Sequence, residues 1–208
     1  MRLALISLLM IPLVVGCDGD GDIGWLTVST GYAHNCGVSS SGSVACWGEN
    51  GAGQSSPPSD TFATVSAGGN HTCGVTTSGS VECWGRDESG QSSPPSGTFA
   101  TVSAGSGHNC GLTTAGIVEC WGSGEHGESS PPSGTFATVS AGEDHSCGVT
   151  TSGSVECWGN DSYTESSPPS VTFVTVSAGG IHSCGVTTTG TVECWGDDSY
   201  GQSNPPEL

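Results

Sequence analysis

The sequence predicts an all-β protein built from five copies of one 37-residue module, and three observations support this fold class. The chain of 208 residues contains 35 Gly and 11 Pro and is only 11% charged, which is typical of short strands joined by turns. Cysteine, histidine and tryptophan recur with a strict period. Within each module, the cysteine spacing fits a β-hairpin.

The repeat accounts for the chain from residue 24 onward without an insertion. A Trp-Gly pair follows the second cysteine of every module, and a His stands two residues before the first cysteine. The module boundaries are 24–60, 61–97, 98–134, 135–171 and 172–208. A module this short buries little apolar surface alone, so the five modules are expected to stack on one another.

The second module shows the expected strands most clearly. We predict strands at 63–67, 71–76 and 80–84, with turns where Gly, Asn, Thr and Ser gather between them. A short fourth strand is expected near 91–93. Pro94 and Pro95 then end the module, because proline cannot donate a hydrogen bond to a sheet.

The middle hairpin predicts five disulfides. A three-residue loop ending in Gly79 places Val75 opposite Val81 and Cys73 opposite Cys83. Opposed residues of antiparallel strands lie within disulfide range. The same spacing in every module predicts the pairs Cys36–Cys46, Cys73–Cys83, Cys110–Cys120, Cys147–Cys157 and Cys184–Cys194.

A zinc site is the alternative interpretation of these cysteines. His71, Cys73 and Cys83 could supply three ligands, but no fourth ligand repeats in the modules. Glu82 is not suitable, because its side chain points to the opposite face of the strand from that of Cys83. We therefore favour disulfides and expect no metal and no other cofactor. Five equal copies are also not how one catalytic centre is built, so we expect no catalytic residues and no enzyme activity.

The first residues resemble an export signal. Arg2 precedes an apolar run over 3–15, which is too short to span a membrane and suits a signal peptide. The run ends at Cys17 in a context that resembles a bacterial lipobox, and Cys17 is the one cysteine off the period. We predict a signal peptide at 1–16 and a lipidated Cys17 with an acidic tether over 17–23. The expected location is a bacterial membrane, on its periplasmic or cell-surface side, and an ordinary signal peptide with an incidental cysteine is the alternative.

The charge of the chain limits its partners. The formal net charge is −18, and Arg2 and Arg86 are the two basic residues apart from histidine. Nucleic acids and anionic lipid surfaces are recognised through cationic side chains, so we expect neither as a partner. Membrane contact is expected only through the lipid anchor.

The module also resembles a known repeat. The pattern is carried by Val65, Ala67-Gly68, His71, Gly79, Trp84-Gly85 and Gly90-Gln91. It resembles the repeat of the regulator of chromosome condensation family, and its short length is similar to that of bacterial members. The resemblance implies a β-propeller with four strands per blade. Since the family typically has seven blades and lacks the paired cysteines, we expect either a propeller of five blades or an open five-module arc that closes by association. The family's nucleotide-exchange role is not carried over, because no interaction residues match.

The modules differ from one another mainly in two windows, one just before the histidine and one just after Trp-Gly. All three tyrosines and Arg86 fall there, and such residues are enriched in interfaces. We therefore predict a binding face for a protein or glycan of the cell envelope. Its residues are Tyr32, Arg86, Asp87, Glu125, His126, Asp144, Tyr163, Ile181, Asp198 and Tyr200.

Three alternatives stay open at this point. The windows could vary merely because loops are weakly constrained. A hydrolase or lyase propeller would need irregular acidic and basic residues to converge on one centre, and the irregular ones come from different modules. A purely structural envelope spacer is the third possibility.

Overall fold

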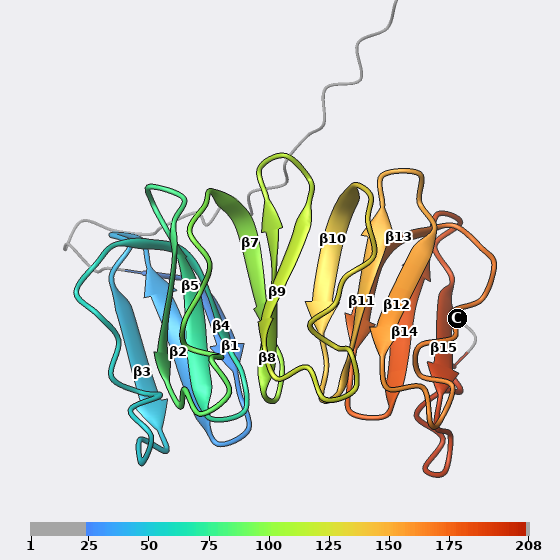
Figure 1. Ribbon diagram of the computed structural model, residues 1–208, viewed down its shortest axis with the longest axis horizontal. Helices are drawn as coiled ribbons and strands as arrows, with labels where there is room; N and C mark the ends of the chain where they lie inside the picture. The colour runs from blue at the N-terminus through green and yellow to red at the C-terminus, as the bar shows by residue number, and fades with distance from the viewer. Residues whose placement is uncertain (1–23, 207–208) are drawn as a thin grey trace, which may run out of the picture.

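A computed structural model describes residues 24–206 as five separate three-stranded antiparallel sheets, which follow one another in chain order (Figure 1). Each sheet is one repeat module and is called a blade below. The strands are β1 (Trp25–Thr30), β2 (His34–Ser39) and β3 (Val44–Gly48); β4 (Phe62–Ala67), β5 (His71–Thr76) and β6 (Val81–Gly85); β7 (Phe99–Ala104), β8 (His108–Thr113) and β9 (Val118–Gly122); β10 (Phe136–Ala141), β11 (His145–Thr150) and β12 (Val155–Gly159); β13 (Phe173–Ala178), β14 (His182–Thr187) and β15 (Val192–Gly196).

The hairpin register predicted from the sequence is confirmed. In blade 2, Cys73 lies opposite Cys83 and Val75 opposite Val81. All five expected cysteine pairs are joined, each across the second and third strands of its own blade. Their Cα atoms lie 4.0–4.1 Å apart. Each disulfide therefore ties together two strands that are already hydrogen-bonded.

A β-bulge near the start of every first strand decides which side chains are buried. In blade 2, Phe62 lies opposite Thr76, but Thr64 lies opposite Val75, so the register shifts between them. Residues three apart normally face opposite sides of a strand. The bulge turns both Phe62 and Val65 inward and leaves Ala63 exposed.

The hydrophobic core lies between the blades. Cys73, Val75 and Val81 of blade 2 form one cluster with Phe99 and Trp121, among other residues of blade 3. The Phe99 and Trp121 rings meet edge to face, with 6.3 Å between their centroids. Equivalent clusters join the other neighbouring blades. A blade thus buries its two faces only by stacking on its neighbours.

The fourth strand expected near 91–93 is not confirmed. Gly90 adopts a φ of 78°, and the Ser93 amide donates a hydrogen bond to the Gly90 carbonyl, 3.2 Å away. This bond closes a turn where an extended strand was expected. The blades of the described structure therefore have three strands each.

A closed ring of five blades is not found in the described structure, and the alternative of an open arc describes it better. Blades 1 and 5 lie at opposite sides of the molecule (Figure 1). Trp25 and Trp47 of blade 1 are 56% and 49% exposed, whereas the equivalent Phe99 and Trp121 are 3% and 9% exposed.

The predicted signal peptide, the lipidated Cys17 and the tether up to residue 23 lie outside the described residues. Over residues 24–206, no helix is long and apolar enough to cross a membrane.

Candidate functional site

The two variable windows lie at the same end of every blade. The first window is the turn between the first and second strands, and the second is the loop after the third strand. Because the strands are antiparallel, the start of β2 pairs with the end of β3, with His34 opposite Gly48. The sequence-variable loops therefore emerge together, while the turn between the second and third strands emerges at the other end.

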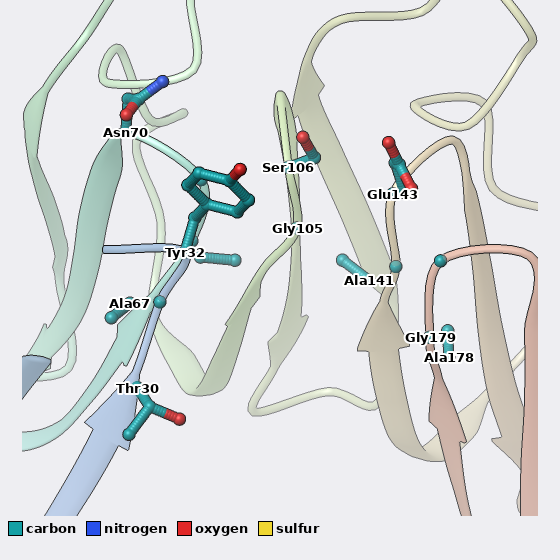
Figure 2. Close-up of a pocket in the computed structure, with 16 residues that line it drawn as sticks. Thr30, Tyr32, Ala67, Asn70, Gly105, Ser106, Ala141, Glu143, Ala178 and Gly179 are labelled. Atoms are coloured by element: carbon teal, nitrogen blue, oxygen red, sulfur yellow. The ribbon is translucent and has the colours of Figure 1, made fainter. Parts of the chain in front are cut away.

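The first-window turns surround a central funnel of about 670 Å³ (Figure 2). Its wall is formed by Thr30 and the equivalent alanines at the ends of the first strands, followed by a glycine in each blade. A backbone ladder links these turns: the Gly69 amide donates to the Gly105 carbonyl over 3.0 Å. A Cβ atom on Gly105 would lie 2.4 Å from the Gly142 carbonyl oxygen, so this close approach requires glycine.

Of the predicted binding residues, Tyr32 is the one that lines the funnel. Its side chain is 90% exposed, and its ring stands at the funnel wall in Figure 2. The neighbouring blades contribute Asn70, Ser106 and Glu143. These three residues were not predicted individually. The sequence analysis did identify the variable window that contains them, just before the repeated histidine. The repeat period and the variation between modules do not show which of the two residues of that window faces the funnel.

The predicted residues of the second window lie in the loops after the third strands. Tyr163 is 51% exposed and Tyr200 is 93% exposed. Arg86, Glu125 and His126 are also exposed, and Arg86 forms an ion pair with Glu88 in its own loop. The structure thus separates the predicted face into an inner set of turns at the funnel and an outer set of loops.

Two of the predicted binding residues also have a structural role. The Asp87 carboxylate accepts hydrogen bonds from the Ser92 amide and the Ser93 hydroxyl, both over 2.8 Å. Asp198 accepts a hydrogen bond from the Ser203 amide in the same way, over 2.9 Å. Both carboxylates hold their own loops in shape, as short acidic side chains do in turns. Asp144 and Ile181 are half-buried in first-window turns and do not line the funnel.

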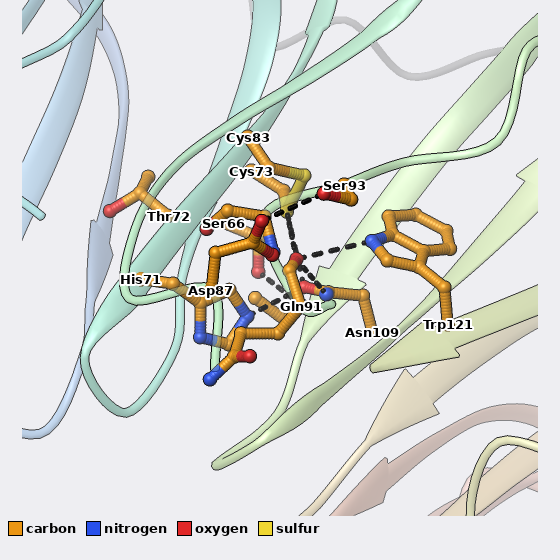
Figure 3. Close-up of a disulfide and its surroundings, with 12 residues drawn as sticks. Ser66, His71, Thr72, Cys73, Cys83, Asp87, Gln91, Ser93, Asn109 and Trp121 are labelled. Atoms are coloured by element: carbon orange, nitrogen blue, oxygen red, sulfur yellow. Dashed lines mark hydrogen bonds between the residues drawn. A yellow bond between two sulfur atoms is a disulfide. The ribbon is translucent and has the colours of Figure 1, made fainter. Parts of the chain in front are cut away.

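The repeated histidines connect neighbouring blades beneath this surface. His71 Nε2 lies 2.8 Å from Asn109 Oδ1 of the next blade (Figure 3). The Gln91 carbonyl accepts hydrogen bonds from Asn109 Nδ2 and Trp121 Nε1, over 2.8 and 3.2 Å. The disulfide Cys73–Cys83 lies beside this network (Figure 3).

Burial disfavours protonation of four of these histidines, His34, His71, His108 and His145. It lowers the pKa of His71, and it lowers the pKa of His108 to about 4 although the Glu128 carboxylate acts in the opposite direction. Among residues 24–206, no group of three or more His, Cys, Asp or Glu side chains is arranged to hold a metal ion.

Five segments of the chain match the sequence pattern of the regulator of chromosome condensation (RCC1) repeat. They are residues 26–54, 62–91, 99–128, 136–164 and 173–202. The chain belongs to the RCC1 repeat family. The family resemblance predicted from the sequence is thereby confirmed, and RCC1-type propellers commonly mediate protein binding. A search of curated proteins finds no match.

Solved structures similar to this RCC1-repeat protein include plant receptor ectodomains. The entire ectodomain of the Physcomitrella patens receptor kinase CR4 is 28% identical, with a TM-score of 0.73 over 87% of this chain and 53% of that one. The CRINKLY WD40 ectodomain of the Arabidopsis thaliana receptor kinase ACR4 is 29% identical, with a TM-score of 0.67 over 83% of this chain and 65% of that one. The chain therefore spans less than two thirds of either ectodomain.

The Saccharomyces cerevisiae protein Prp20p, described with binding properties toward Gsp1p and histones, shares the fold. It is 16% identical, with a TM-score of 0.74 over 88% of this chain and 59% of that one.

Proposed function

We propose that this protein is an exported, lipid-anchored binding module without catalysis, which captures a protein partner at the loop-bearing end of its blades. The proposal rests on one observation. All three tyrosines, Arg86 and His126 lie in exposed loops at one end of a rigid stack of disulfide-bonded sheets. Aromatic and arginine side chains on a rigid scaffold are the usual anchors of protein interfaces.

The location of the protein is part of the same proposal. Five disulfides suggest an oxidising environment outside the cytosol, either extracellular or periplasmic. The resemblance of the segment around Cys17 to a lipobox supports anchorage of the chain to a bacterial membrane through a lipid.

The charge of the surface indicates the chemistry of the partner. The loops at the proposed end carry acidic residues such as Glu49, Glu125, Glu143 and Asp161, against the single cation Arg86, which is already paired. A complementary partner would present basic residues around an apolar or aromatic contact. A protein fits this description better than a neutral glycan.

The test is a pull-down from the cell envelope with the full chain. A rim variant replaces Tyr32, Arg86, Tyr163 and Tyr200 with Ala. A matched variant replaces Thr77, Thr114, Thr151 and Thr188 with Ala in the turns at the opposite end. We expect the rim variant to lose the captured protein, the matched variant to retain it, and added salt to weaken capture. Capture that survives in the rim variant but fails in the matched variant would show that the other end binds.

A further inference from the structure

The loop that follows β3 contains a chemically reactive pair of residues. Asn50 is the one asparagine of the chain that a glycine follows, and Asn50 and Gly51 are both exposed. In such a pair the backbone nitrogen of the glycine can attack the asparagine side chain, because glycine has no side chain to hinder the close approach. The attack forms a succinimide ring, and water then opens the ring to leave a carboxylate.

The structure places a base on the nitrogen that must lose its proton. The Gly51 amide donates a hydrogen bond to Glu49 Oε1 over 2.9 Å. A Cβ atom on residue 51 would lie 2.6 Å from that same oxygen, so a side chain at this position would push the carboxylate away. Glu49 therefore lies where a general base for the attacking nitrogen is needed.

Donors surround the oxygen of Asn50 that gains charge during the attack. Oδ1 of Asn50 accepts hydrogen bonds from the Ser55 amide over 2.9 Å and from the Ser56 hydroxyl over 3.3 Å. Because a backbone amide can only donate, the contact with Ser55 identifies this atom as the oxygen. The leaving nitrogen, Nδ2, lies 3.0 Å from the same Ser56 hydroxyl. Two donors thus face the developing negative charge, and a hydroxyl lies within reach of the leaving group.

The equivalent loops of other blades already contain the product of this reaction. The position of Asn50 is occupied by aspartate in three blades: Asp87, Asp161 and Asp198. In blade 2, the Asp87 carboxylate accepts hydrogen bonds from the Ser92 amide and the Ser93 hydroxyl, both over 2.8 Å (Figure 3 shows the second). Asn50 makes the same two contacts in its own loop. An aspartate at residue 50 would therefore keep the hydrogen bonds that shape the loop.

We propose that Asn50 is a site of self-catalysed deamidation, at which the folded loop converts asparagine to aspartate without a separate enzyme. The Gly51 nitrogen gives its proton to Glu49 and bonds to Cγ of Asn50. The Cγ–Nδ2 bond then breaks, and the nitrogen leaves as ammonia with a proton returned through Glu49 or Ser56. Water adds to Cγ, the bond from Cγ to the Gly51 nitrogen breaks, and the peptide N–H is restored. The net reaction consumes one water, releases one ammonium ion and leaves one carboxylate.

The donors on Oδ1 also select the product. Water can open the succinimide at Cγ, which gives aspartate, or at the backbone carbonyl carbon, which gives isoaspartate. Attack at Cγ places negative charge on Oδ1 again, where the Ser55 amide and the Ser56 hydroxyl stabilise it. The folded loop should therefore yield mainly aspartate, whereas an unfolded Asn-Gly segment yields mainly isoaspartate. The conversion adds one negative charge to the loop-bearing end of the blades.

The test follows the full chain at physiological pH and temperature by peptide mass spectrometry, with electron-based fragmentation to separate aspartate from isoaspartate. Glu49→Gln removes the base, and Ser56→Ala removes one donor. Each substitution should slow the conversion of Asn50 about tenfold or more. Glu156→Gln and Ser93→Ala are the matched controls, because they make the same changes at exposed residues of other blades. Both controls should convert Asn50 at the wild-type rate.

The same chain unfolded in guanidinium chloride supplies the second comparison. We expect the native protein to convert Asn50 faster than the unfolded chain does, and to yield mainly aspartate. A native rate at or below the unfolded rate would show that the fold protects Asn50 and would overturn the proposal. Conversion of E49Q at the wild-type rate, or isoaspartate as the main native product, would overturn it as well.

Discussion

At the residue scale, Thr164 is the clearest departure from the repeat. It has a φ of 63°, where the equivalent Gly53, Gly90, Gly127 and Gly201 have φ values of 78–87°. A β-branched residue is disfavoured in this left-handed region because its Cβ crowds the backbone. Blade 4 therefore carries local strain that the other blades avoid.

Replacing Thr164 with Gly should raise the free energy of unfolding by about 0.5–1 kcal/mol, since relief of strain outweighs the extra entropy of glycine in the unfolded chain. Denaturant unfolding followed by circular dichroism measures this change. The reverse substitution, Gly127→Thr, should lower the free energy of unfolding by about 1–2 kcal/mol. A destabilised T164G protein would contradict the interpretation of Thr164 as strained.

The interblade histidines form a second residue-scale feature. His108 Nε2 lies 2.7 Å from the Ser146 hydroxyl, which donates onward to the Glu128 carbonyl over 3.4 Å. Whichever of the two atoms donates, the bond to Ser146 occupies Nε2 of His108. Nδ1 of His108 is buried and has no partner among the described residues. Protonation would place a second N–H at that position without an acceptor, which agrees with the lowered pKa of His108.

The protein should consequently lose stability as the pH falls from about 6.5 to 4. The pKa of His108 is about 4 in the folded state and 6.5 in the unfolded state, so the unfolded state binds a proton first across this window. His108 alone would contribute up to about 3 kcal/mol of the loss. The pKa values of His34, His71 and His145 are lowered in the same direction.

Unfolding midpoints measured at a series of pH values check this prediction, with His108→Gln as the comparison. Gln can keep a donor near Ser146 but does not titrate, so the pH dependence of H108Q should be shallower than that of the wild type. Parallel curves for the two proteins would show that other groups cause the loss.

At the scale of the elements, stability resides in the junctions between blades. Trp121 is 9% exposed and donates from Nε1 to the Gln91 carbonyl of the preceding blade over 3.2 Å. The equivalent Trp47 is 49% exposed because the described arc has no blade before it. The same residue type thus occupies a junction in one blade and a free face in another.

Trp121→Phe should lower the free energy of unfolding by about 1–2 kcal/mol, since it removes a buried hydrogen bond and part of the packed ring. Trp47→Phe in dilute solution should lower it by less than about 0.5 kcal/mol. Thermal unfolding of the two variants beside the wild type gives the comparison. Equal losses would mean that Trp47 is buried in solution, either by a second copy or by another partner.

The hairpins could be predicted from the sequence because turn length fixes register. A loop ending in Gly79 determines that Cys73 faces Cys83, without any knowledge of the rest of the molecule. The missing fourth strand could not be predicted in this way. Residues 91–93 form a turn because Asp87 binds the Ser92 amide and the Ser93 hydroxyl from within the loop, and spacing does not reveal such contacts.

At the scale of the whole molecule, the period predicts stacking but not closure. Each interface involves a local pair of blades, whereas ring closure depends on the rotation accumulated over all of them. The end on which the variable loops lie could be predicted, because it follows from antiparallel strand order. The division of these loops into an inner set at the funnel, with Tyr32, and an outer set, with Tyr200, could not be predicted from the sequence. It depends on which strand of each blade lies nearest the centre.

Hydrogen exchange can test directly whether a partner binds at the loop-bearing end of the blades. The full chain would be measured with and without the captured envelope protein. We expect slower exchange on binding in the first-window turns, such as 68–70 and 142–144, and in the loops after the third strands, such as 86–90. Slower exchange confined to the turns at the opposite end, such as 77–79 and 151–153, would contradict it.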